Sequence, residues 1–234
     1  MGTGGDLWIK VCGMKDAANV AAVASLGVSR IGFIFHPRSP RFVGHSLVVP
    51  RECTGLARRI GVFVDSSVEE VCRVIEEWSL DGVQLHGVES PGYCRDLRRE
   101  WRGELLKAVG VFDEPLGSLV APYDGEVDGI LLDTRLSSSR IDPSEGPAGG
   151  TGRAFDWRLL DTYEGSTPYI VAGGVGPANI GDLLQYRDRE LFVGIDLNSQ
   201  VESNPALKDI AKVRQIMSIV RKRVERGIED GSEV

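Results

Sequence analysis

The chain has 234 residues, of which 42% are hydrophobic and 26% are charged. These shares are ordinary for a globular protein and exclude the fibrous and disordered classes. The formal charge of −7 at pH 7 argues against non-specific binding to nucleic acid or to an anionic membrane. We therefore expect neither nucleic acid nor a membrane as a partner.

The chain carries no targeting signal that we recognise. No apolar run approaches the ~18 residues of a membrane span, and the first six residues, Met-Gly-Thr-Gly-Gly-Asp, lack the basic and apolar segments of a secretory signal. A disulfide framework or a zinc site is not expected, because the four cysteines include no CxxC pair. These observations predict a cytoplasmic protein with free thiols. The cysteines are Cys12, Cys53, Cys72 and Cys94.

Apolar periodicity switches repeatedly between the spacing of strands and that of helices. Residues 44–58 form a poor helix, because Pro50 lies inside them and only their second half can be helical. The other expected strands and helices alternate along the chain. The strands are residues 8–12, 30–35, 60–64, 82–86, 105–111, 129–132, 169–172 and 191–196. The helices are residues 16–26, 68–78, 92–101, 116–121, 156–161, 177–186 and 207–224.

Eight strand–helix units in this order predict a parallel sheet. Eight units within 234 residues fit a closed (β/α)₈ barrel (a TIM barrel) that spans residues 1–234 as a single domain. A doubly wound open sheet is the alternative, but the expected Gly-x-Gly-x-x-Gly is missing after the first strand. We expect a leader at 1–7 and a charged tail at 225–234 to be flexible.

Polar side chains gather where the strands of such a barrel end, which is where its chemistry takes place. Lys10 and Cys12 share one face of the first strand, and Gln84 and His86 share one face of the fourth. Asp133 ends the sixth strand. An acid and a base on opposite strands of one barrel mouth suit an isomerase, provided that Lys10 or a bound anion lowers the pKa of the thiol. The alternatives are a buried hydrophobic Cys12 and an Asp133 that caps the next loop.

Three neighbouring loops near the last strands are rich in glycine or in Ser and Asn. Glycines let backbone N–H groups approach an anion closely, and the last loops of barrels commonly hold phosphate. We therefore expect a phosphate site here, with ordinary turn glycines as the alternative. Its residues are Gly150 and Gly152, Gly173 and Gly174, and Asn198 and Ser199.

The three histidines are scattered, and we expect His36 and His45 to lie on the surface. No set of residues has the spacing of a metal site, so we expect no metal. No cofactor is expected either.

The motifs together resemble those of the phosphoribosylanthranilate isomerase family, over residues 8 to 222. Each motif is weak alone, and their order and spacing carry the resemblance. They are Lys10-Val11-Cys12-Gly13, Gly32-Phe33-Ile34-Phe35, Ser39-Pro40-Arg41, Gly61-Val62-Phe63, Val83-Gln84-Leu85-His86-Gly87, Leu131-Leu132-Asp133, Gly149-Gly150-Thr151-Gly152, Phe155-Asp156-Trp157, Ala172-Gly173-Gly174, Gly194-Ile195-Asp196, Ser199, Val201-Glu202-Ser203 and Lys208-Asp209.

The resemblance implies a cofactor-independent aldose–ketose isomerase of tryptophan biosynthesis. Its substrate would be the small phosphosugar N-(5′-phosphoribosyl)anthranilate, and its product 1-(2-carboxyphenylamino)-1-deoxyribulose 5-phosphate. By motif, Asp133 is implied as the general acid and Cys12 as the general base. Arg41 is implied to face the anthranilate carboxylate, and the three loops to hold the phosphate. Gln84 and His86 would line the mouth.

This sequence departs from the family pattern at three positions: His36 stands where an aromatic or apolar residue is frequent, and Gln200 and Ala206 stand where glycine is frequent. The segment 134–148 is longer than usual and is either a lid or a surface insertion.

Two other functions remain open: a related sugar-phosphate isomerase of histidine biosynthesis, and a non-catalytic phosphosugar-binding barrel. The family contains monomers and dimers, so we expect a monomer or a homodimer.

Overall fold

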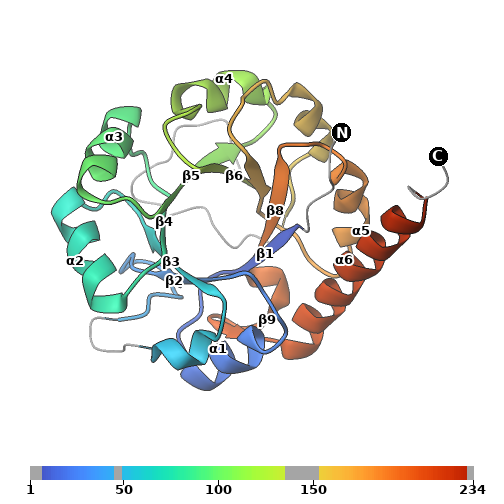
Figure 1. Ribbon diagram of the computed structural model, residues 1–234, viewed down its shortest axis with the longest axis horizontal. Coiled ribbons are helices and arrows are strands. Elements are labelled where there is room, and N and C mark those ends of the chain that lie inside the picture. The colour runs from blue at the N-terminus through green and yellow to red at the C-terminus, as the bar shows by residue number, and fades with distance from the viewer. Residues whose placement is uncertain (1–6, 45–48, 135–152, 231–234) are drawn as a thin grey trace.

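The computed structural model describes residues 7–44, 49–134 and 153–230, with side chains up to Arg221. Within these ranges, eight parallel strands close into a barrel in the order of the sequence, with helices around it (Figure 1). The strand β1 pairs with β2 on one side and with β8 on the other, which closes the ring. The predicted (β/α)₈ barrel is confirmed. The strands are β1 (Trp8–Val11), β2 (Arg30–Ile34), β3 (Arg58–Phe63), β4 (Gly82–Leu85), β5 (Glu104–Val111), β6 (Gly129–Thr134), β7 (Tyr169–Val171) and β8 (Phe192–Leu197).

The apolar core has two parts, one inside the barrel and one between the strands and the helices. On β5, Leu106 and Ala108 face the interior, whereas Leu105 and Val109 pack toward the helices. This alternation is the two-residue period of a strand, which buries both faces of a parallel sheet. The interior cluster consists of Ile60, Leu106, Ala108, Leu131, Ile170 and Ala172.

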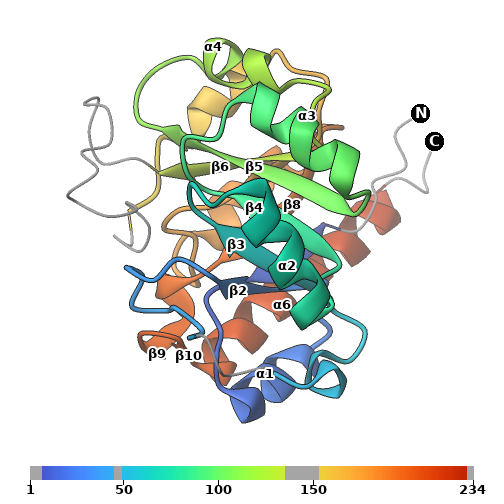
Figure 2. The same cartoon turned by 90° about the vertical axis from the view of Figure 1, so that its left-hand side faces the viewer.

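Several helices begin at the polar residues that the sequence provides. The side chains of Asp16, Ser67 and Ser90 each accept a hydrogen bond from the backbone N–H three residues later. The helices α2 and α3 lie side by side over the outside of β3 and β4 (Figure 2). The α-helices are α1 (Ala17–Ala24), α2 (Val68–Trp78), α3 (Pro91–Glu100), α4 (Leu116–Val120), α5 (Ile180–Leu183) and α6 (Ile210–Asp230). The 3₁₀ turns are η1 (Arg51–Thr54), η2 (Ala121–Tyr123), η3 (Trp157–Thr162), η4 (Leu184–Tyr186) and η5 (Ser199–Val201).

The segment between β2 and β3 forms only a short helical turn, as the proline within it predicts. Between β2 and β3, the described residues contain only the 3₁₀ turn η1, which begins directly after Pro50. Proline has no N–H to continue a helix through this point. Residues 45–48 lie outside the described residues.

The end of the chain differs from the prediction in two ways. The expected helix at 207–224 begins only at Ile210, because Leu207–Lys208 forms a short strand, β10, that pairs with β9 (Glu202–Asn204). Asn19 of α1 fixes β10 in place, since its amide exchanges two hydrogen bonds of 2.8 and 2.9 Å with the backbone of Lys208. In addition, α6 continues to Asp230, so residues 225–230 of the expected flexible tail are helical.

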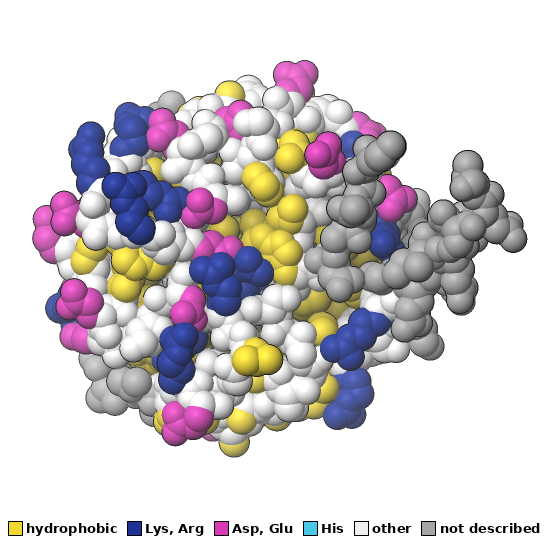
Figure 3. Space-filling model, in the orientation of Figure 1, with side chains coloured by type: hydrophobic (Ala, Val, Ile, Leu, Met, Phe, Trp, Pro, Cys, Tyr) yellow, Lys and Arg dark blue, Asp and Glu magenta, His cyan; other side chains and the backbone are white. Residues whose placement is uncertain are grey.

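Charged side chains form ion pairs at the end of the barrel where the strands begin. Arg30 and Glu104 are the first residues of β2 and β5, and they form a bidentate ion pair with a shortest distance of 2.7 Å. Arg58 contacts the same carboxylate at 3.3 Å. Figure 3 shows basic and acidic side chains interspersed on one face of the molecule. Among the described residues, no helix combines the length and apolar character needed to cross a membrane.

Candidate active site

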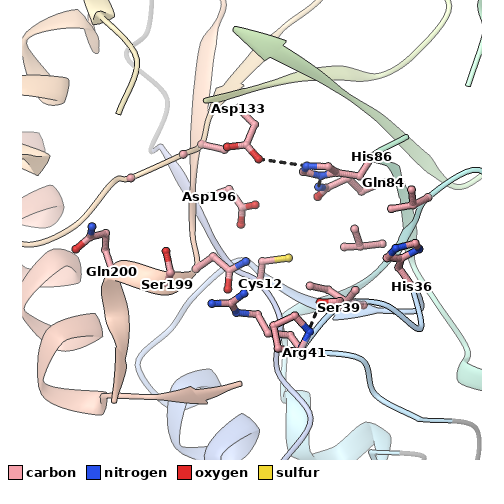
Figure 4. A pocket seen from close by; sticks show the side chains of 18 of the residues that line it. Cys12, His36, Ser39, Arg41, Gln84, His86, Asp133, Asp196, Ser199 and Gln200 are labelled. Carbon is pink, nitrogen blue, oxygen red and sulfur yellow. Dashed lines mark hydrogen bonds and ion pairs between the residues drawn. The ribbon is translucent and has the colours of Figure 1, made fainter. Parts of the chain in front are cut away.

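A cavity of about 260 Å³ lies at the carboxyl ends of the strands. Figure 4 shows Cys12, Asp133 and Asp196 around the same space, although they come from three different strands or strand ends. Most of the predicted site residues meet here, while Gly150 and Gly152 lie outside the described residues. The predicted residues that line the cavity are Cys12, Arg41, Gln84, His86, Asp133, Gly173, Gly174, Asn198 and Ser199.

Cys12 directly follows β1, and its backbone N–H donates to the carbonyl of Leu197 at 2.8 Å. The residue is only 3% exposed, yet it lines the cavity. Glycine at position 32 leaves room for it, because a Cβ there would lie 2.8 Å from the Cys12 Sγ. Burial raises the pKa of Cys12, and the nearby Lys10 offsets only part of this effect. Lys10 thus lowers this pKa as the sequence predicts, but burial outweighs it, and the resting group is a thiol.

Lys10 is fully buried beside Cys12, and its Nζ lies 2.8 Å from Oδ2 of Asp196. Burial opposes its charge, but Asp196 and Cys12 together raise the pKa of Lys10 above its ordinary value, so it stays protonated. Burial also raises the pKa of Asp196, and Lys10 offsets part of that rise. Lys10 does not line the cavity, which argues against the direct substrate contact predicted for it.

Asp133 lies on β6 and is held by one hydrogen bond and by a contact with His86. Its Oδ1 accepts from the N–H of Thr134 at 2.8 Å, and its Oδ2 lies 3.2 Å from Nε2 of His86. The other ring nitrogen of His86, Nδ1, lies 2.7 Å from Nε2 of the buried Gln84. Gln84 and His86 share a face of β4 and its end, as predicted, and they orient the carboxyl group across the mouth.

Arg41 lines the cavity but is already paired on one side. Its Nε and Nη2 donate to the two carboxylate oxygens of Glu202 at 2.8 and 2.7 Å. Lys208 approaches the same carboxylate at 2.7 Å and also donates to Asn198 Oδ1 at 2.9 Å. The three charges of Arg41, Glu202 and Lys208 sum to one positive charge beside the cavity. A ligand anion can therefore meet Arg41 only through its remaining N–H groups.

Two adjacent glycines follow β7 with left-handed backbone conformations, Gly173 at φ +73° and Gly174 at φ +66°. A Cβ at Gly173 would lie 2.3 Å from Oγ1 of Thr134, so a side chain does not fit there. Asn179 fixes the loop, since its Oδ1 accepts from Gly176 N–H at 2.8 Å and its Nδ2 donates to the Gly174 carbonyl. Such a rigid glycine turn suits an anion that backbone N–H groups contact.

The comparisons with known proteins agree with this geometry. Residues 9–218 match the family described as N-(5′-phosphoribosyl)anthranilate (PRA) isomerase. The chain belongs to this family. It is 37% identical to the N-(5′-phosphoribosyl)anthranilate isomerase of Phocaeicola vulgatus, over 93% of this chain and 99% of that protein.

Solved structures of PRA isomerases share the fold. The enzyme from Thermus thermophilus has 27% identity and a TM-score of 0.75, covering 93% of this chain and 100% of that one. A second PRA isomerase structure, at 24% identity and a TM-score of 0.71, covers 92% of this chain and 99% of that one. It was solved in complex with reduced 1-(o-carboxyphenylamino)-1-deoxyribulose 5-phosphate.

The structure of this PRA isomerase family member corrects one sequence-based assignment. His36 does not lie on the open surface: it lines the cavity, and its Nε2 is buried. Burial lowers its pKa, and the neighbouring Arg38 lowers it further, so the ring is neutral at pH 7. His45 and residues 135–148 of the segment expected to be a lid or a surface insertion lie outside the described residues.

Three residues of the site belong to motifs of the sequence whose function the sequence alone does not indicate: Gly32, Asp196 and Glu202. Gly32 makes room for Cys12, Asp196 pairs with Lys10, and Glu202 holds Arg41. Two signals in the sequence point to the acidic members of this set. The alternation of side chains puts Asp196 at the end of β8, and Glu202 is the acidic residue of the Val-Glu-Ser motif. Ala206, where the family often has glycine, has φ +67°, which explains the preference for glycine. Among the described residues, no group of three or more His, Cys, Asp or Glu side chains is placed to hold a metal ion.

Proposed function

We propose that Cys12 is the general base and Asp133 the general acid of this PRA isomerase. Membership of the family gives the reaction: N-(5′-phosphoribosyl)anthranilate is isomerised to 1-(2-carboxyphenylamino)-1-deoxyribulose 5-phosphate, a step of tryptophan biosynthesis. The observation that carries the assignment of roles is that Cys12 and Asp133 line one cavity from non-adjacent strands. A substrate in this cavity is contacted from two sides.

The reaction needs one proton donated and one removed. Asp133 gives a proton to the furanose ring oxygen, the bond from that oxygen to C1′ breaks, and a protonated Schiff base forms at C1′. Cys12, as the thiolate, then removes the proton from C2′, and the electrons of that C–H bond form the C1′–C2′ double bond of an enolamine. This enolamine tautomerises to the ketone. Each role needs a group within hydrogen-bond reach of its proton, which the shared cavity permits.

The two anionic ends of the substrate fit opposite parts of the cavity. The loops with Gly173, Gly174 and Ser199 suit the 5′-phosphate, together with Gly150 and Gly152 by their motif. Arg41 suits the anthranilate carboxylate through the donors that Glu202 does not use. Apolar side chains of Ile34, Val62 and Val64 line the same cavity and suit the aromatic ring.

Turnover of N-(5′-phosphoribosyl)anthranilate by the purified chain tests the activity, and Cys12→Ser and Asp133→Asn test the two roles. General acid–base groups contribute about 10²- to 10⁴-fold, so each variant should lose at least 100-fold in kcat. Near-normal kcat in both variants would overturn the roles. Complementation distinguishes this reaction from that of the related isomerase of histidine biosynthesis. The gene should rescue a tryptophan auxotroph, and rescue of a histidine auxotroph alone would contradict the proposal.

The small-molecule substrate is the only partner that we propose. The expected monomer or homodimer remains a prediction from the resemblance, and the cytoplasmic location remains a prediction from the sequence.

A further inference from the structure

Asp196 is a buried carboxylate that the acid–base scheme does not use. It lies on β8, is 7% exposed, and lines the cavity between Asp133 and Cys12 (Figure 4). Its Oδ2 is bound by Lys10 at 2.8 Å. Its Oδ1 is buried and has no hydrogen-bond partner among the described residues. A buried acceptor without a partner is unfavourable, which points to a donor that arrives with the ligand.

The anchor of Asp196 determines what kind of ligand group it can take. Lys10 is fully buried and is its register partner on β1, so the ion pair fixes the carboxylate rigidly. Asp133, His86 and Cys12 also interact electrostatically with Asp196. A carboxylate repels the phosphate and the anthranilate carboxylate, and it accepts hydrogen bonds only. The suitable donors of the substrate are therefore its sugar hydroxyl groups and its anthranilate N–H.

The position of Cys12 selects one of these donors, the hydroxyl on C2′. Cys12 lies two residues after Lys10 on the same face of the chain, and its N–H is bound to Leu197, the residue after Asp196. The thiol and the carboxylate are thus close neighbours in the cavity wall. Cys12 takes the proton from C2′, and the hydroxyl on that same carbon is the one that lies nearest to its neighbours.

We propose that Oδ1 of Asp196 accepts a hydrogen bond from the 2′-hydroxyl of the substrate and so directs the C2′ hydrogen toward Cys12. The inference rests on the proposed function, since it takes C2′ as the site of proton removal. Asp196 is then a substrate-binding residue that fixes the rotation about the C1′–C2′ bond. Lys10 is a positioning residue that holds Asp196.

Binding of two stable analogues tests this proposal without any chemical step. The first is the reduced product, 1-(2-carboxyphenylamino)-1-deoxyribitol 5-phosphate, which has a hydroxyl on C2. The second is the same molecule with hydrogen in place of that hydroxyl. Calorimetric Kd values are measured for the wild type and for Asp196→Asn. A hydrogen bond to a charged group is worth about tenfold or more in affinity, so the wild type should prefer the hydroxyl analogue by that factor.

The ratio of the two Kd values is the decisive readout. In Asp196→Asn the preference should fall to less than about threefold, while the Kd of the deoxy analogue stays within about threefold of the wild type. Equal weakening of both analogues, or an unchanged ratio, would mean that Asp196 only supports Lys10, and the proposal would be overturned. A wild type that binds both analogues equally would overturn it as well.

A second variant covers the case in which a buried, unpaired Lys10 prevents folding. Lys10→Met with Asp196→Leu removes both charges, a change that buried ion pairs often tolerate. It should show the same loss of preference. Turnover by the wild type distinguishes a failure of this proposal from a failure of the proposed function. Turnover without a preference for the hydroxyl analogue rejects only the role of Asp196. Absence of both turnover and analogue binding rejects the proposed function itself.

Discussion

His86 and Asp133 are paired side chains at the mouth of the barrel, with 3.2 Å between Nε2 and Oδ2. Gln84 contacts Nδ1 of the same ring at 2.7 Å, so Nε2 is the ring nitrogen that faces Asp133. The acid is therefore oriented by a chain of three side chains from β4 to β6. An oriented proton donor is a requirement of general acid catalysis.

Replacing His86 should slow the reaction more than it weakens binding. In His86→Gln the ring that contacts Asp133 is lost, and we expect kcat to fall about 10- to 100-fold with KM nearly unchanged. The matched control is His36→Gln, because His36 lines the same cavity at a distance in sequence from the acid. That variant should change KM rather than kcat. A His86→Gln enzyme with altered KM and normal kcat would contradict the orienting role.

The pKa of Cys12 predicts how the reaction depends on pH. Burial raises this pKa, Lys10 and Lys208 act against the rise, and Asp196 adds to it. The base is active only as a thiolate, so kcat/KM should increase with pH through a limb above the ordinary thiol pKa of about 8.5. Removing the positive charge of Lys10 in Lys10→Met should move this limb to still higher pH.

The control for this pH dependence is a buried thiol outside the cavity. Cys94 lies in α3, and burial raises its pKa to about 11. Cys94→Ala should leave the pH profile of kcat/KM unchanged from pH 6 to 10. A profile in the wild type that is flat over this range would argue against a thiolate base.

Gly32 predicts a steric effect on the base. A methyl group at this position would lie 2.8 Å from Sγ and 3.1 Å from Cα of Cys12, and 3.2 Å from Cε of Lys10. Overpacking of this kind costs about 1–3 kcal/mol, and the displaced thiol should lower kcat in Gly32→Ala by about tenfold or more. Gly181→Ala is the control, since nothing lies within 4 Å of a Cβ there. It should keep full activity, and equal losses in both variants would reject the steric explanation.

The sequence predicts local elements well because their signals are local. The bounds of α2, Val68–Trp78, agree with the prediction, since Ser67 caps its first turn and Ser79 ends it in a left-handed conformation. The helix after β8 was placed too early because β10 is only two residues long and depends on the side chain of Asn19 in α1. No periodicity within residues 202–208 carries that information.

The candidate site likewise has a part that the sequence predicts and a part that it does not. Strand-end positions and motifs were sufficient to select Cys12, Asp133, Gln84 and His86, which all line the cavity. The ion pairs that hold the site were not predictable, because Lys10 and Asp196 are 186 residues apart in sequence. Only the closure of the barrel brings such residues together, and burial then outweighs the expected effect of Lys10 on the pKa of Cys12.

Glu202 provides the last prediction, because it holds Arg41 and Lys208 together. Side-chain exposure is only 9% for Arg41 and 6% for Glu202, so Glu202→Gln leaves two buried cations without their anion. Loss of one partner from a buried pair costs about 3–5 kcal/mol, and the released Arg41 should raise KM for the substrate at least tenfold. Urea unfolding and steady-state kinetics measure the two effects. Glu70→Gln is the matched control, since its pair with Arg73 has side chains about half exposed and is worth at most about 1 kcal/mol. If both variants lost the same stability and kept the same KM, the Arg41–Glu202 pair would have no role in holding the substrate side of the cavity.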